Sequence, residues 1–296
     1  MRYTIYLLGI ALALYSCAKP SQEGSEGQGA VETSMFKEYI FALEGVDHLK
    51  EGDSFMVFVP CSESALTSQM IVTDEGAMLP LKLETAEGIV AGDAIYAYSP
   101  GVNSASGNPS EVALSIPAVQ KQAGLHFDLS CFPIVGEPFI ADCTLPVGRK
   151  ELAGTISVNP LYAVARFDIC VMQNFNDSQV IKSVAFVSDG IAGEFTYNLT
   201  SGSSEIPVLG NNTITTQVEG LSISSVGAVV SVYMALAPGV HTGTAVAKIG
   251  DAEVAVDLKE VVFERGSVTP IAMFVQGDIV GGGETFDPSE EFDWEK

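Results

Sequence analysis

The chain has 296 residues, of which 47% are hydrophobic and 17% are charged. This balance supplies enough apolar surface for a folded core, so a largely disordered protein is excluded. The 37 acidic residues outnumber the 14 basic ones and give a formal net charge of -23. Because such a surface repels phosphate backbones, nucleic acid is excluded as a partner.

The first residues have the layout of a secretory signal peptide. Arg2 precedes an uncharged apolar run over residues 5–15, which is shorter than the roughly 20 residues of a spanning helix. The stretch LYSC, ending at Cys17, resembles the lipobox of bacterial lipoproteins, in which the cysteine is acylated. We therefore predict a signal peptide over residues 1–16 and a lipid such as palmitate on Cys17. The alternative is an ordinary cleaved signal with an incidental cysteine.

The sequence after Cys17 divides into a tether and a β-rich remainder. Residues 17–34 are rich in Gly, Ser, Gln and Glu and predict a flexible tether. Short apolar stretches then alternate with Gly, Pro, Asn and Asp, which is typical of β-strands and turns. No stretch keeps apolar residues at helical spacing for more than about two turns. The predicted class is all-β.

The predicted strands continue to the end of the apolar sequence. They lie at residues 39–43, 54–60, 79–84, 93–100, 111–117, 124–130, 153–160, 161–171, 183–189, 193–200, 212–218, 227–238, 243–250, 252–259 and 267–275. Gly250 and Asp251 predict a tight hairpin. Strands of this number bury their apolar faces as two-sheet sandwiches. We predict one sandwich domain over residues 35–148, a second over 149–277 and an acidic tail over 278–296.

The strand at residues 161–171 has a clear alternation. Period two places one set of side chains on one face, Ala165, Phe167, Ile169 and Val171, and the other set opposite, Arg166, Asp168 and Cys170.

Four cysteines remain after Cys17, namely Cys61, Cys131, Cys143 and Cys170. In an exported protein they could form two disulfides in any of three connectivities, and the alternative is a set of buried free thiols. Their spacing contains no CxxC or Cys/His pattern for a metal or for redox chemistry.

Catalytic and metal-binding patterns are missing from the sequence. The three histidines, His48, His126 and His241, have no ligand spacing, and no nucleophile elbow or phosphate loop occurs. Acidic clusters such as Glu290, Glu291 and Asp293 lack the oxygen spacing of a calcium loop and favour a solvated acidic face. We predict no enzyme activity, no cofactor and no metal.

A set of motifs in fixed order resembles one family. The motifs are the lipobox ending at Cys17 and residues 92–100, 116–120, 159–169, 181–202, 232–251 and 263–275. With them the chain resembles the fimbrillins, the lipoprotein precursors from which Bacteroidales bacteria build surface fimbriae (type V pili). The resemblance implies two tandem transthyretin-like β-sandwich domains and a non-catalytic cell-adhesion role at the bacterial cell outer membrane.

The resemblance also implies a mode of assembly with other fimbrial subunits. A protease removes the lipidated N-terminal segment with the first strand, and the opened groove accepts a strand of the next subunit. The covering strand would lie within residues 35–43. The donated strand would come from the C-terminal region, residues 268–280 with the tail.

One departure from the family concerns processing after arginine. No arginine lies between Arg2 and Arg149, and Lys37 and Lys50 are the basic residues near the first strand. Either a protease of different specificity cuts at one of these lysines, or the subunit keeps its first strand and its lipid as an anchor.

Two other functions stay open from the sequence. One is a monomeric surface lipoprotein whose sandwich loops bind a glycan or a protein of a host or bacterial surface, although the only tryptophan is Trp294 in the tail. The other is a secreted hydrolase, for which no catalytic constellation is found.

The lipid assignment makes a direct prediction. Cys17→Ala removes the thiol that carries the acyl chain, so labelling of the protein with radioactive palmitate should be abolished. Labelling that persists in this variant contradicts the lipobox assignment.

Overall fold

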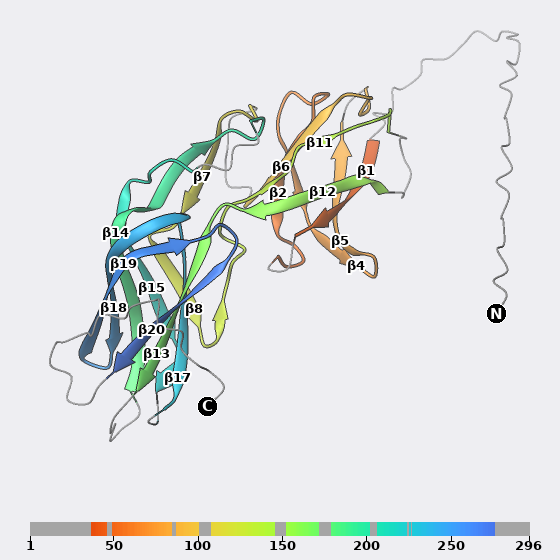
Figure 1. Ribbon diagram of the computed structural model, residues 1–296. Coiled ribbons are helices and arrows are strands. Elements are labelled where there is room, and N and C mark those ends of the chain that lie inside the picture. Colours follow the sequence, from red (N-terminus) through yellow and green to blue (C-terminus); the bar gives the residue numbers. More distant parts are fainter. Residues whose placement is uncertain are drawn as a thin grey trace, which may run out of the picture. The chain divides into compact units, whose positions relative to one another are not determined.

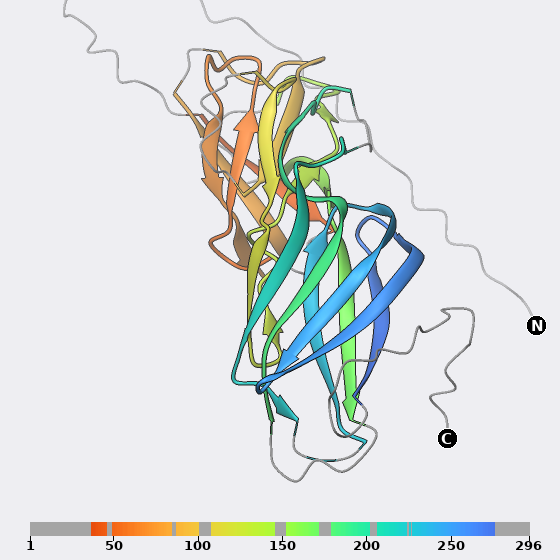
Figure 2. The same cartoon turned by 90° about the vertical axis from the view of Figure 1, so that its left-hand side faces the viewer.

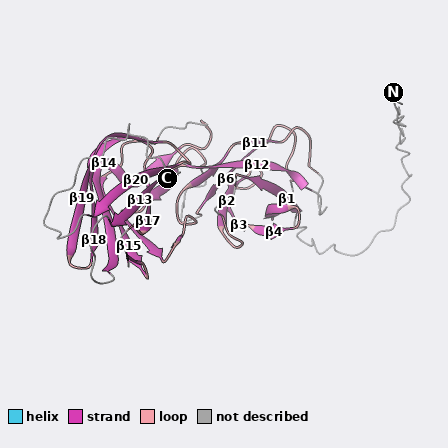
Figure 3. Cartoon of the chain, turned by 60° about the horizontal axis from the view of Figure 1, so that its bottom comes forward, coloured by secondary structure: helices cyan, strands magenta, loops and turns pink. Residues whose placement is uncertain are grey.

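The computed structural model describes residues 37–45, 49–84, 87–100, 108–145, 152–171, 179–201, 206–223, 225 and 227–275. Over these ranges the chain forms twenty β-strands and no helix (Figures 1 and 3), which confirms the all-β class. Accordingly, nothing in the described part of the chain is a helix long and apolar enough to cross a membrane.

The first six strands, β1 to β6, form a nine-stranded sheet together with β10, β11 and β12. Its order is β3-β2-β6-β10-β12-β1-β5-β4, and β11 pairs with β6. The bounds are β1 Lys37–Glu44, β2 Ser54–Phe58, β3 Leu66–Gln69, β4 Ile71–Thr73, β5 Gly76–Leu83, β6 Ala94–Ser99, β10 Ile134–Gly136, β11 Phe139–Ile140 and β12 Leu152–Pro160.

The remaining strands form two further sheets. One has the order β17-β13-β20, and the other has the order β19-β18-β14-β15-β8-β9, with β16 and β7 also paired to β14. The bounds are β7 Val112–Ile116, β8 Val119–Ala123, β9 His126–Phe127, β13 Ala163–Val171, β14 Gln179–Tyr197, β15 Asn211–Glu219, β16 Ser222–Ile223, β17 Val229–Leu236, β18 Gly239–Ile249, β19 Ala252–Phe263 and β20 Val268–Val275. Their long ribbons, green to blue, are seen from another side in Figure 2.

Alternation along each strand places the apolar side chains in the core. In β13 the residues Ala165, Phe167, Ile169 and Val171 are completely buried, as predicted. The ring of Phe186 on β14 lies 6.4 Å from that of Phe167 and 6.1 Å from that of Phe263 on β19. These aromatic contacts join the three-stranded sheet to the eight-stranded sheet.

The nine-stranded sheet folds back on itself around buried apolar residues that belong to the same core cluster. The hydroxyl of Ser68 on β3 donates a hydrogen bond to the carbonyl of Pro80 on β5, although β3 and β5 are not neighbours in the sheet. Phe41, Phe55 and Tyr98 from three of its strands are completely buried.

β14 corrects two of the predicted strands. Residues 183–189 and 193–200 were expected as separate strands, and the structure has one strand, Gln179–Tyr197. Its pairing with β15 is irregular between Val187 and Ala192. Residues 188–191 lie between these two paired positions without a one-to-one partner on β15. Such an irregularity bends a strand without ending it. The first part then pairs with β15 and β18 and the last part with β7.

Strand pairing crosses residue 148, where a domain boundary was expected. β7 and β8, which precede it, pair with β14 and β15. β12, which follows it, pairs with β1 and β10. The expected strand at residues 124–130 is reduced to β9, His126–Phe127, whereas the unpredicted strand β8 precedes it. The hairpin at Gly250 is confirmed, because Ile249 pairs with Ala252 and Gly250 has a positive φ of 58°.

The aromatic contacts of Phe186 lead to a stability prediction. Phe186→Ala removes a fully buried ring and leaves a cavity, so the free energy of unfolding should fall by about 3–5 kcal/mol in urea titrations followed by circular dichroism. Lys182→Ala is the matched control on β14, since it breaks only an exposed ion pair with Asp251 and should cost at most about 1 kcal/mol. Equal losses in the two variants would contradict this packing.

Candidate functional site

β1 lies inside a sheet although it is the first strand of the described chain. Residues 37–42 pair antiparallel with residues 78–83 of β5. Residues 40–44 pair parallel with residues 152–157 of β12. Both edges of β1 are therefore used, and its removal would leave the facing edges of β5 and β12 without a partner. We call the space that β1 fills between β5 and β12 the β1 slot.

The inward face of β1 fills the slot with large side chains at alternate positions. Tyr39, Phe41 and Leu43 are all buried, and burial of each such side chain contributes about 1.5–3 kcal/mol. The ring of Phe41 meets that of Phe139 edge to face, with 5.4 Å between centroids. Gly154 on β12 makes room for Phe139, because a Cβ at this position would overlap its ring.

A polar contact also ties β1 to the fold. The backbone N–H of Ile89 donates a hydrogen bond of 3.1 Å to the hydroxyl of Tyr39, and both residues are buried. Loss of β1 would leave this N–H without an acceptor. Any strand that replaces β1 must therefore satisfy Ile89 as well as the backbone groups of β5 and β12.

Phe139, Gly154 and Ile89 were not predicted as parts of the site. Ile89 lies outside every predicted strand, and Phe139 belongs to the two-residue strand β11. Gly154 offered a signal, because a glycine inside a strand pattern marks a close approach of a neighbouring group. The neighbour itself is identified only by the tertiary structure.

The two candidate processing residues differ in their relation to β1. Lys37 is the first residue of β1, so a cut after it would leave most of the strand in the sheet. Lys50 follows β1, and a cut after it would separate the whole strand from the rest of the chain. Of the two, only Lys50 can release β1.

Lys50 lies at the surface beside an acidic partner. Its Nζ is 3.1 Å from Oδ1 of Asp128, and the two side chains are 48% and 54% exposed. Burial raises the pKa of Asp128, but hydrogen bonds from Ser130 and Lys50 together with the charge of Lys50 outweigh it and hold the pKa below its usual range. The ion pair is exposed and therefore weak, so it leaves Lys50 accessible.

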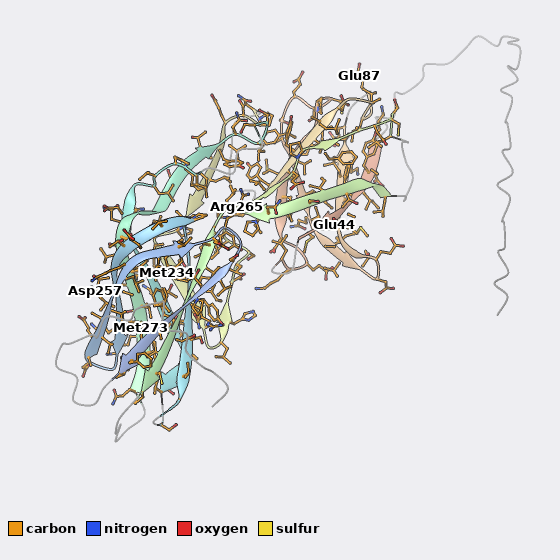
Figure 4. The ribbon with its side chains drawn as sticks, in the orientation of Figure 1. Glu44, Glu87, Met234, Asp257, Arg265 and Met273 are labelled. Carbon is orange, nitrogen blue, oxygen red and sulfur yellow. The ribbon has the colours of Figure 1, made fainter. Side chains whose placement is uncertain are left out.

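The expected donor segment is already used within the chain. Residues 268–275 form β20, which pairs parallel with β13 over its whole length. Ile271, Met273 and Val275 are buried, and Met273 is labelled in Figure 4. Donation of β20 would dismantle the three-stranded sheet. Residues 276–280 and the tail lie outside the described residues.

Disulfide bonds are not formed by the four described cysteines, which are Cys61, Cys131, Cys143 and Cys170. Burial raises the pKa of the thiols of Cys61, Cys131 and Cys170, and a hydrogen bond with Asp142 raises that of Cys143. A raised pKa keeps a cysteine in its less reactive thiol form. Cys17 lies outside the described residues.

The two described histidines differ in burial. His126 is exposed on β9, and His241 is buried with Nε2 2.8 Å from the carbonyl oxygen of Ala237. Asp168, expected on the face of β13 opposite Phe167, is buried, lies 2.9 Å from Arg166 and accepts a hydrogen bond of 2.6 Å from the Ser231 hydroxyl. In the described ranges no group of three or more His, Cys, Asp or Glu side chains is placed to hold a metal ion. His48 lies outside these ranges.

Comparison with solved structures finds the same fold in several bacterial proteins. A candidate cell adhesion protein of Bacteroides uniformis has a TM-score of 0.52 and 11% identity, over 84% of this chain and 98% of that one. One from Bacteroides ovatus has a TM-score of 0.50 and 12% identity, over 83% and 95%. One from Bacteroides fragilis has a TM-score of 0.50 and 8% identity, over 82% and 88%.

Because the matches extend over most of each chain, these likenesses establish the fold. Because the identities are low, they establish the fold alone. No protein-family model matches the sequence. No curated protein matches it either.

The contact between Tyr39 and Ile89 can be tested by a single substitution. Tyr39→Phe keeps the ring and removes the oxygen that accepts from the buried N–H of Ile89, so the free energy of unfolding should fall by about 1–3 kcal/mol. Tyr96→Phe, on a half-buried ring of β6, is the comparison variant and should cost less. If the Tyr39→Phe protein were as stable as the wild type in urea, this hydrogen bond would make no contribution to the free energy of unfolding.

Proposed function

We propose that this chain is a structural subunit of surface fimbriae, or a fimbrial adhesin, that is exported as a lipoprotein and joins other subunits by exchange of β1. The observation that carries the proposal is the central position of β1 in its sheet. The chain's first described strand fills a slot that another strand of the same geometry could fill. The likeness to candidate cell adhesion proteins supports a role at the cell surface.

The β1 slot sets the requirements for an incoming strand. It must provide backbone groups for β5 on one side and β12 on the other, and large apolar side chains at alternate positions for the places of Tyr39, Phe41 and Leu43. An open slot would expose the unpaired edges of β5 and β12, which could pair with strands of other molecules. Retention of β1 until assembly protects the subunit from uncontrolled association.

The sequence after Val275 supplies the donor in this proposal, because β20 is held in its own sheet. Two large aromatic residues of the tail, Phe292 and Trp294, are separated by one residue. In an extended strand they would point to the same face, about 7 Å apart. That spacing matches two consecutive inward-facing positions of β1, such as those of Tyr39 and Phe41.

Processing decides between two roles of the subunit. A cut after Lys50 frees β1 and makes a stalk subunit that accepts a strand. An uncut chain keeps β1 and the lipid on Cys17, and serves as an anchor at the outer membrane. N-terminal sequencing of surface material separates the two, because a stalk subunit begins at Glu51 and an anchor begins at acylated Cys17.

The exchange can be tested with a protease site placed on either side of β1. With a specific site after Lys50, cleavage should allow release of the β1 fragment and produce SDS-resistant ladders of high mass on gels. With the same site ahead of Lys37, cleavage leaves β1 joined to the fold, and the protein should stay monomeric. Double substitution with Phe292→Ser and Trp294→Ser should abolish the ladders of the first protein.

Each part of this proposal has its own contradictory result. Monomers in both cleaved proteins, even after addition of a synthetic peptide of residues 284–296, would rule out exchange at β1. Ladders that persist in the Phe292→Ser, Trp294→Ser protein would rule out the tail aromatics as the donor while leaving the slot intact.

A further inference from the structure

The outer edge of β17 is covered by side chains where a neighbouring strand would normally lie. β17 pairs with β13 along one edge, and it is an edge strand of the sheet with the order β17-β13-β20. Its other edge presents backbone groups of Ser231, Tyr233 and Ala235. Such a row of N–H and C=O groups is a template for pairing with a strand of another molecule.

Gln120 makes the same two bonds with Ala235 that a paired strand residue would make. Its Nε2 donates to the carbonyl oxygen of Ala235 at 2.6 Å, and its Oε1 accepts from the N–H of Ala235 at 2.9 Å. In an antiparallel ladder two opposed residues also exchange one N–H and one C=O bond each. The glutamine amide thus takes the place of a backbone peptide group.

Gln122 also makes two bonds to this edge, but it bridges two residues of β17, Tyr233 and Ser231. Its Oε1 accepts from the N–H of Tyr233 at 2.8 Å, and its Nε2 donates to the carbonyl oxygen of Ser231 at 3.0 Å. The hydroxyl of Thr216 on β15 donates to the carbonyl oxygen of Tyr233 at 3.0 Å. Side chains therefore satisfy five backbone groups on three alternate residues of β17.

The pairing of β8 with β15 fixes the positions of the two glutamines. Residues 119–123 of β8 pair parallel with residues 215–219 of β15 in the eight-stranded sheet. Gln120 and Gln122 are two residues apart and so lie on the same face of β8, opposite alternate residues of β17. They are only 4% and 1% exposed, and a buried amide is costly unless it is hydrogen-bonded. Both glutamines avoid that cost through the β17 edge.

We propose that Gln120 and Gln122 form a glutamine cap that closes the outer edge of β17 to strand addition by another molecule. An incoming strand would need the backbone groups of Tyr233 and Ala235 that the cap already uses. β8 is itself paired with β15, so the cap stays in place unless that pairing is broken. The cap is independent of exchange at β1 and directs strand addition away from β17.

The experiment uses the full chain with an uncut β1, so that association at the β1 slot does not contribute. Gln120→Met and Gln122→Met are combined, because methionine has a similar length and shape but cannot replace the amide bonds. Lys121→Met is the matched control on the exposed face of β8. Sedimentation reports the mass, and hydrogen exchange reports the amides of Tyr233 and Ala235.

In the double variant these two amides should exchange at least about tenfold faster than in the wild type, and the protein should form dimers or larger species. The wild type and Lys121→Met should be monomeric at the same concentration. Addition of Ala235→Pro to the double variant should restore the monomer, because proline removes the edge N–H that pairs with the added strand.

Three results would overturn the proposal. One is a folded double variant with rapidly exchanging Tyr233 and Ala235 amides that stays monomeric. Another is association of the double variant that Ala235→Pro does not reduce, because such association would come from non-specific hydrophobic contacts of the new methionines. The third needs no variant: in the wild type, Tyr233 and Ala235 amides that exchange as fast as exposed loop amides would show that the glutamine cap does not exist.

Discussion

The need to pair backbone N–H and C=O groups at strand edges governs this molecule, because all of the regular secondary structure in its described ranges is β-strand. A sheet edge without partners either binds water or attracts another strand. β1 meets the need with its own backbone between β5 and β12. The outer edge of β17 meets it with glutamine side chains. β19 is an edge strand of the eight-stranded sheet, and it carries exposed charges such as that of Asp257, which is labelled in Figure 4.

These solutions differ in whether they can be undone. β1 is joined to the following strands by one loop that contains Lys50, so a single cut there would end its covalent link to the rest of the fold. Gln120 and Gln122 belong to β8, which is itself paired to β15. No single cut at the surface removes the cap. In the assembly proposed above, one edge that opens and others that stay closed would give an added strand a single place to pair.

Most strands were predictable because their side chains alternate between core and solvent. β13 is the clearest case, with four completely buried residues at alternate positions. β14 was divided in two by its Asp-Gly sequence, which usually marks a turn, and the structure uses this segment as an irregularity within one strand. β8 was missed because its buried residues are glutamines, and a polar residue on the inner face breaks the apolar pattern on which such predictions depend.

The sequence by itself determined the all-β class, the acidic surface, the hairpin at Gly250 and the apolar faces of most strands, because these follow from residue type and local spacing. The tertiary structure alone decided that β1 lies between β5 and β12, that β8 joins the sheet of β15, and that pairing crosses residue 148. Strand partners far apart in the sequence share no local signal. Their choice depends on the register and side-chain volumes of both strands together, as the fit of Phe139 over Gly154 illustrates.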